Sequence, residues 1–247
     1  ERVTLSSLDL QAEVRSGVAT VAVAWVLANP SPVPQEGDFV FPIPPGAAVR
    51  DFALYDGEKR LDAEMLDRDR ATAVYEQIVR QRRDPALLAY AGQAALRLRV
   101  FPIAPGATRQ VTLKLTVVLP RDGMARRFAW PLAGPHLPRP EQVALRAVFH
   151  DVGGVYSPTH AVDVRRDSDT RTVVRYVAKG DDPALRESPE IALYATPSDP
   201  AAVALAVLTH RGPGGDGTFL VLASPNVADP ERAAPPRRVV LVMDRSG

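Results

Sequence analysis

The stretch LDLQAEVRSGVATVAVAWVLA, residues 8–28, decides the fold class of this chain. Apolar residues alternate with polar ones from Leu8 to Val14, which is the period of two of a half-buried strand. After Ser16-Gly17, a tight-turn pair, apolar side chains recur at every second position from Val21 to Leu27. The stretch therefore predicts a β-hairpin and favours a mostly β chain.

A strand, turn and strand pattern then occurs twice. Residues 39–46 (FVFPIPPG) and residues 100–106 (VFPIAPG) each run from apolar residues into a proline-glycine turn. A further strand pattern follows each copy, at residues 49–54 and 111–117. The two copies indicate a weak internal repeat, and they are too few for a solenoid.

One segment has a different period. From residue 67 to residue 83, apolar side chains recur at helical spacing, with acidic residues at the start and arginines at the end. Asp84-Pro85 then favours a second short helix that stops at Gly92. We expect a short helical insert at about residues 67–91.

Short strand patterns return from residue 128 to residue 222, separated by turns rich in glycine and proline. The run at residues 239–243 (VVLVM) is instead apolar throughout, which is typical of a strand buried on both faces of a parallel sheet. We therefore predict two β-sandwich-like lobes, residues 1–120 with the helical insert and residues 121–234. Residues 235–247 would start a further domain.

The composition excludes several classes of function. The 30 basic and 29 acidic residues leave a net charge of +1, which gives no electrostatic reason to expect nucleic acid or an anionic membrane as a partner. There is no cysteine, and no apolar run reaches the roughly 18 residues that span a bilayer. The chain opens on Glu1, which fits a cleaved signal peptide or a trimmed chain.

Motifs of catalysis are also missing from the sequence. The four histidines are scattered singly, which disfavours a zinc site, and no Gly-x-Ser-x-Gly elbow of a hydrolase occurs. The glycine-rich residues 212–217 lack the Lys-Ser/Thr of a phosphate-binding loop and predict a solvated hairpin loop. Arg80, Arg82 and Arg83 fit a solvated helix end or, alternatively, a docking site for an acidic partner. We expect no enzymatic activity.

Several motifs together resemble one known family. They are AVYEQIVR at residues 73–80, RRDPALL at residues 82–88 and LRVFPIAPG at residues 98–106, preceded by Asn29-Pro30 and FPIPPG at residues 41–46. This series is similar to the hallmark segments of the vault protein inter-alpha-trypsin (VIT) domain. The resemblance covers roughly residues 5–120. Residues 156–160 (YSPTH) and 217–220 (GTFL) more weakly resemble the segment that follows such domains.

The resemblance implies a von Willebrand type A domain after residue 235. In the family this domain opens with a buried strand that ends in Asp-x-Ser-x-Ser, a magnesium-dependent adhesion motif. Asp244 and Ser246 match the first part of this motif, and their hard oxygen atoms suit Mg²⁺. Because the rest of the motif lies outside the 247 residues, we expect no cofactor in this chain alone and a Mg²⁺ site only in an intact type A domain.

The resemblance also implies a role in protein interaction. We expect a non-enzymatic, secreted or cell-envelope scaffold that presents an adhesive type A domain to a protein or extracellular-matrix ligand. The alternative is an intracellular assembly factor of a large complex. We also expect the apolar strand at residues 237–243 either to add to an edge of the second lobe or to pair with another chain in self-association, because an unpaired apolar strand tends to find a partner strand.

Overall fold

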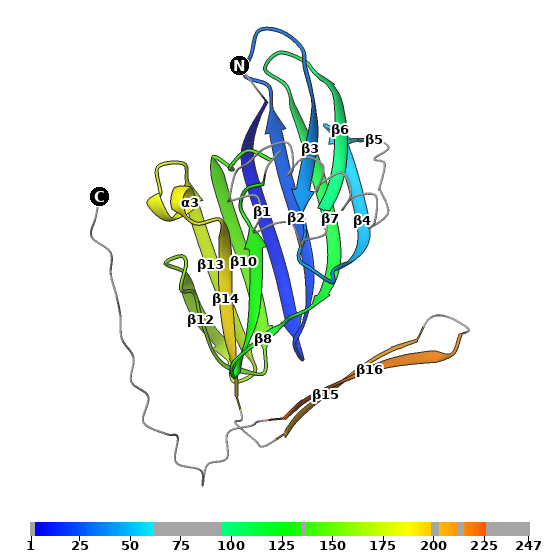
Figure 1. Cartoon of the computed structure of the whole chain (residues 1–247), viewed down its shortest axis with the longest axis vertical. Coiled ribbons are helices and arrows are strands. Elements are labelled where there is room, and N and C mark those ends of the chain that lie inside the picture. Colours follow the sequence, from blue (N-terminus) through cyan, green and yellow to red (C-terminus); the bar gives the residue numbers. More distant parts are fainter. Residues whose placement is uncertain (1–2, 62–94, 135–136, 199–202, 212–214, 226–247) are drawn as a thin grey trace, which may run out of the picture. The chain divides into compact units, whose positions relative to one another are not determined.

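The computed structural model describes residues 3–61, 95–134, 137–198, 203–211 and 215–225. These residues form a mostly β fold with several sheets, which confirms the predicted fold class (Figure 1). The expected helical insert at residues 67–91 and the expected strand at residues 239–243 lie outside the described residues. In the described ranges, no helix is long and apolar enough to span a membrane.

The largest sheet of the described chain has eight strands, in the order β12-β13-β10-β1-β2-β7-β4-β5. Their bounds in chain order are β1 Thr4–Arg15, β2 Val18–Ala28, β4 Ala48–Asp56, β5 Lys59–Leu61, β7 Thr108–Val118, β10 Gln142–His150, β12 Asp163–Ser168 and β13 Arg171–Lys179.

Two smaller sheets supply the opposite layer. One contains β8 (Arg121–Asp122), β9 (Ala125–Pro131), β11 (Val152–Tyr156) and β14 (Glu190–Pro197), and the other pairs β3 (Gln35–Pro42) with β6 (Ala95–Ile103). A short helix, α3 (Pro183–Glu187), precedes β14. All these elements belong to one compact unit, residues 1–199. The hairpin of β15 (Val203–Arg211) and β16 (Gly217–Pro225) belongs to a second unit that begins at Pro200.

The predicted hairpin at residues 8–28 is confirmed as β1 and β2, which pair antiparallel. Ser16 and Gly17, the two residues between these strands, have φ values of 51° and 78°. Positive φ at both central positions is the type I′ geometry that matches the twist of a two-residue hairpin.

The predicted internal repeat is visible in the turns that follow β3 and β6. In the first turn the Ala47 N–H donates to the Pro44 carbonyl at 3.2 Å, and in the second the Ala107 N–H donates to the Ala104 carbonyl at 3.0 Å. Gly46 and Gly106 have φ values of 74° and 69°, so each turn is of type II with proline before glycine. The two copies also pair with each other, β3 with β6 and β4 with β7.

The core lies between the eight-stranded sheet and the two smaller sheets. Trp25 on β2 is 1% exposed, and its ring lies 4.7 Å from that of Phe41 on β3 and 6.2 Å from that of Trp130 on β9. One side chain of the large sheet therefore contacts both smaller sheets. Such aromatic contacts add to the stabilisation that comes from burying the rings.

Strands from both sides of residue 120 share the large sheet. β1 pairs with β2 on one side and, in parallel, with β10 on the other, where Leu8 lies opposite Val143 and Val14 lies opposite Phe149. The boundary that we predict between two lobes therefore falls between strands of one continuous sandwich. The pairing fixes β10, β13 and β12 to the N-terminal half of the fold.

Candidate functional site

The residues that the sequence singles out for metal or acidic ligands lie outside the described residues. These are Asp244 and Ser246 of the partial adhesion motif and the arginines Arg80, Arg82 and Arg83. Within the described ranges, no group of three or more histidine, cysteine, aspartate or glutamate residues is placed to hold a metal ion.

A charged surface lies on the outer face of the large sheet, over β10 and β13. On β13, Val174 and Tyr176 point into the core, so the residues between and beside them point outward. Of the five outward pairs that lie opposite each other across the two strands, three follow one another at the end of β10. They are Arg146 with Arg175, Val148 with Val173, and His150 with Arg171. We call these six residues the arginine–valine face.

The valines form the floor of this face. Val173 is 4% exposed and Val148 is 5% exposed, although neither belongs to the core cluster. Arg146 and Arg175 are exposed, and neither makes a hydrogen bond or ion pair with another described residue. Like charges directly opposite on antiparallel strands are destabilising, so the pairing of Arg146 with Arg175 costs stability, which Asp163 on the other side of Arg175 offsets in part.

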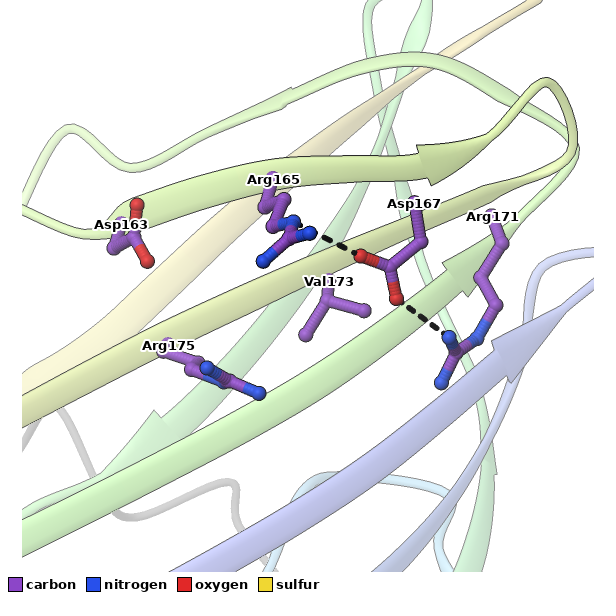
Figure 2. A pocket seen from close by; sticks show the side chains of 6 residues that line it. All are labelled: Asp163, Arg165, Asp167, Arg171, Val173 and Arg175. Carbon is purple, nitrogen blue, oxygen red and sulfur yellow. Dashed lines mark hydrogen bonds and ion pairs between the residues drawn. The ribbon is translucent and has the colours of Figure 1, made fainter.

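On the side of the neighbouring edge strand β12, the β13 members of the arginine–valine face line a hollow of about 450 Å³ together with residues of β12. Figure 2 shows its lining, in which Asp167 lies between two arginines. The Arg171 Nη1 atom is 2.6 Å from Asp167 Oδ2, and the Arg165 Nε atom is 3.4 Å from Asp167 Oδ1. One carboxylate is therefore shared by two guanidinium groups. Arg175 lines the same hollow from β13, where it pairs with Asp163 of β12 (Figure 2).

A third strand, β1, borders the arginine–valine face on its other side. Glu13 lies opposite Val148, and its Oε1 atom is 3.0 Å from His150 Nε2 and 2.7 Å from Arg15 Nη2. Hydrogen bonds from Arg15 and then His150 lower the pKa of Glu13. The carboxylate of Glu13 is thus engaged locally and makes no ion pair with Arg146 or Arg175. Asp163 lies opposite Arg175 across β12 and β13, and no ion pair joins the two side chains.

The YSPTH segment, residues 156–160, forms a hydrogen-bonded corner in which His160 is buried while Tyr156 and Pro158 are exposed. The Thr159 hydroxyl accepts from the Ala192 N–H at 3.0 Å and lies 2.9 Å from His160 Nδ1. His160 is 5% exposed, and its Nε2 atom has no hydrogen-bond partner of good geometry among the described residues. The segment therefore fastens the loop before β12 to β14.

Tyr176 and Asp182 are the titratable neighbours of His160 in this corner. The Tyr176 ring packs edge-on at 4.8 Å, and its hydroxyl donates to Asp182 Oδ2 at 3.1 Å. Burial lowers the pKa of His160, and the Asp182 carboxylate and the Ala184 backbone oppose this shift in part. Burial and the bond to Asp182 raise the pKa of Tyr176 to about 12. Asp182 also caps α3 by accepting from the Ala184 N–H.

Asn29 is a second buried polar group that serves the fold. Its side-chain N–H groups donate to the carbonyls of Val33 and Ile103, each at 2.8 Å, while its Oδ1 atom accepts from the Ser31 N–H and hydroxyl. Its backbone pairs with Gly106 and Ala107 in the second repeat turn. Asn29 thus joins the end of β2 to both the following loop and the repeat.

Comparison with known proteins identifies the first half of this fold. Residues 5–115 match the family model "Vault protein inter-alpha-trypsin domain". The chain contains a VIT domain. In the described residues, the VIT domain comprises β1 to β7 up to Leu115. The sequence resemblance to this family is confirmed.

The curated relatives are proteins with a further domain in their names. The chain is 32% identical over 149 residues to von Willebrand factor A domain-containing protein 5A of Rattus norvegicus, which covers 58% of this chain and 18% of that protein. Against the Homo sapiens protein of the same name the identity is 36% over 138 residues, covering 53% and 17%. The match thus spans about a fifth of the length of these relatives.

A solved structure shows the same fold outside the VIT region as well. It is a putative nutrient binding protein of Legionella pneumophila, with a TM-score of 0.52 and 11% identity, covering 78% of this chain and 67% of the other. At this identity the likeness concerns the fold alone. It extends well beyond the VIT domain, in agreement with a sandwich that continues through β14.

The arginine–valine face was not found from the sequence. Its members come from β10 and β13, and their opposition depends on strand register. A detectable signal existed in the pattern RTVVRYV at residues 171–177, where two arginines flank an outward position occupied by valine.

Proposed function

We propose that the chain is a non-enzymatic protein-interaction module that holds and presents a von Willebrand type A domain. The observation that carries this proposal is the continuity of the sandwich. The VIT domain and the strands after it share one sheet through the β1–β10 pairing, so they form a rigid platform ahead of residue 200. The similarity to proteins named for a type A domain supports a domain of that type after the platform.

The buried polar groups of the platform also fit an interaction role. Asn29 and Ser31 use their hydrogen bonds on backbone groups and on each other, and His160 packs against the Tyr176 ring in a corner held by the partly buried Thr159. The outer face of the sheet at β12 and β13 bears a group of arginines and aspartates instead. A folded support with a charged outer surface is suited to binding partners.

In a complete type A domain, Asp244 and Ser246 would supply a carboxylate and a hydroxyl to a magnesium ion. These are hard oxygen ligands, which Mg²⁺ prefers. The ion would provide a positively charged position for an acidic group of a ligand. The type A domain would then bind the ligand, and the VIT platform would hold the type A domain in place.

The proposed setting is extracellular or on the cell envelope, with an intracellular assembly factor as the alternative. Protease treatment of intact cells separates the two. Cleavage of the native protein under conditions that spare a cytoplasmic marker supports the first setting. Protection until the cells are lysed supports the alternative.

The type A proposal is tested on the native polypeptide. Its mass and its terminal sequences show whether a serine follows Gly247 and a further domain is present. In that polypeptide, calorimetric titration with Mg²⁺ should give binding that Asp244→Ala removes and that the control Asp216→Ala, an exposed carboxylate near β16, retains. A native mass near 26.7 kDa would refute the type A proposal.

Self-association belongs to the same proposal. The β15–β16 hairpin exposes apolar side chains on one face, with Leu205 69%, Val207 61% and Phe219 75% exposed. Residues 237–243 follow this hairpin in the sequence, and we propose that they pair two copies of the chain. Sedimentation velocity of the 247-residue chain tests this, because Leu241→Asp should shift a dimer to a monomer. A monomeric parent chain at high micromolar concentration would refute it.

A further inference from the structure

We propose that the arginine–valine face binds an extended acidic segment of a partner protein, in which acidic side chains flank an apolar one. This inference rests on the proposed interaction role and names the chemistry of the partner. It concerns β10, β12 and β13, none of which the VIT family model covers.

Positive charge on this surface is only partly compensated. Among its described residues, the arginines Arg146, Arg165, Arg171 and Arg175 outnumber the carboxylates Asp163 and Asp167. Asp167 already contacts Arg165 and Arg171, and Glu13 on the adjacent strand contacts Arg15 and His150. Arg146 lies opposite the neutral Gln11 of β1, and Arg175 lies opposite Asp163 of β12 without an ion pair, so both guanidinium groups are exposed and can accept a further carboxylate. A carboxylate placed between two opposed guanidinium groups removes their repulsion and gains charge-assisted hydrogen bonds.

The apolar floor favours a ligand that is not purely ionic. Val148 and Val173 are each at most 5% exposed and lie between the Arg146–Arg175 pair and the His150–Arg171 pair. Because both valines are covered in this structure, an apolar side chain of a ligand reaches them only when the side chains that cover them move aside. The order arginine, valine, arginine along β13 occupies residues 175, 173 and 171, all on one face.

The spacing of side chains along β13 determines which sequence pattern of the peptide fits this face. Same-face residues of a strand are about 6.6 to 6.8 Å apart, since each residue rises about 3.3 to 3.4 Å. An extended peptide has the same period, so acidic–x–apolar–x–acidic places its three side chains over Arg175, Val173 and Arg171. The hollow of about 450 Å³ beside Asp167 gives room for side chains of this size.

The structural alternative is that these charges only keep the edge strand β12 from pairing with other chains, a common use of charged residues at sheet edges. That alternative explains Arg165 and Asp167 on β12. It does not explain Arg146 and Arg175, which lie on interior strands of the sheet.

The test uses the 247-residue chain and a fluorescein-labelled peptide with the core Glu-Ser-Val-Ser-Glu between Gly-Ser flanks. Fluorescence anisotropy should show saturable binding in 50 mM NaCl that weakens at least fivefold in 500 mM NaCl, because exposed charge pairs are screened. Arg146→Gln with Arg175→Gln should weaken binding at least tenfold. Arg50→Gln, an exposed arginine on β4, is the matched control and should change binding less than twofold.

Two readouts separate binding from structure. The double variant should unfold at about the same denaturant concentration as the parent, because it removes the like-charge pair Arg146–Arg175 together with the opposite-charge neighbours Arg175 and Asp163, whereas a structural role predicts a loss. A peptide with the central valine changed to serine should bind at least threefold more weakly.

The outcomes that overturn the inference are distinct from those that overturn the proposed function. Equal binding by parent and double variant, or no binding of the peptide, refutes the inference. Binding of a sulfated polysaccharide probe, heparin, with no binding of the peptide refutes the peptide class in favour of a polyanion. The native mass and the magnesium titration do not involve these arginines and test the proposed function separately.

Discussion

Replacement of Asn29 by alanine should destabilise the sandwich strongly. Asn29 is 1% exposed and joins three pieces of chain through its amide. The change leaves the Ile103 carbonyl and the Ser31 N–H without these buried partners, and each unsatisfied buried group costs about 1–3 kcal/mol. Since water can reach the partly buried Val33 carbonyl, we expect a loss of about 3–5 kcal/mol in the free energy of unfolding.

The assay is denaturant unfolding followed by tryptophan fluorescence, because Trp25 and Trp130 are both buried in the core and report its opening. Gln11→Ala, on the exposed face of β1, is the control and should change stability by less than about 0.5 kcal/mol. A loss below about 1 kcal/mol for Asn29→Ala would show that the amide network is dispensable.

Asn29→Asp adds a test of the hydrogen-bond directions. The substitution keeps an oxygen acceptor for Ser31 but turns a second oxygen toward the Val33 and Ile103 carbonyls. Burial beside carbonyl oxygens raises the pKa of such a carboxyl, so its folded state binds more protons than its unfolded state. Stability relative to the parent should therefore rise as pH falls from 7 to 5. A deficit that is constant over this range would contradict the assigned donors.

Three further changes test separate features. Gly106→Ala should lower the free energy of unfolding by about 1 kcal/mol, measured by denaturant unfolding, because the φ of 69° disfavours a side chain. A new Cβ at Gly106 meets no atom within 4 Å, so the loss reflects the backbone alone. Gly215→Ala, where the Cβ also meets no atom, is the control and should be neutral. Trp130→Phe should lower the free energy of unfolding by at most about 1.5 kcal/mol, because the indole N–H that it removes is buried without a partner among the described residues. Trp130→Ala, which also empties the ring's place in the core, should lower it by about 3–5 kcal/mol. Equal losses for the two variants would contradict this account of the indole N–H. Stability should decline as pH falls below about 6.5, where the unfolded state protonates His160 more readily than the folded state, and His160→Gln should flatten that decline.

The parts of the fold that sequence could predict are those governed by local chemistry. Alternation at residues 8–28 predicts the first hairpin, and Ser16-Gly17 provides the positive φ values of its turn. The two proline-glycine turns were recognisable because φ near 70° favours glycine. The helix α3 went unpredicted although Asp182-Pro183 is a capping pair, because five residues leave too short a periodic pattern.

The candidate surface could not be predicted in the same way. Its opposed arginines lie on β10 and β13, and the turns and strands between them contain no signal of the register that brings Arg146 against Arg175. A one-residue shift of both strands would turn these arginines into the core and expose inward residues such as Leu145 and Tyr176. The register is therefore set by the buried face of the sheet, and the arginines come together on the outer face as a consequence.

The parallel pairing of β1 with β10 has a consequence for where the VIT domain ends as a physical unit. Residues 5–115 alone lack β10, so β1 would be an edge strand. In the whole sandwich the inward residues of β1, Leu8 and Leu10, are at most 1% exposed. An unpaired edge of this length invites pairing with other chains. β10 covers that edge, and the Glu141 N–H donates to the Leu5 carbonyl at 2.9 Å where the contact begins. The strands after the family match therefore complete the domain, and a ligand bound on β10 and β13 acts on the same rigid sheet as the VIT strands.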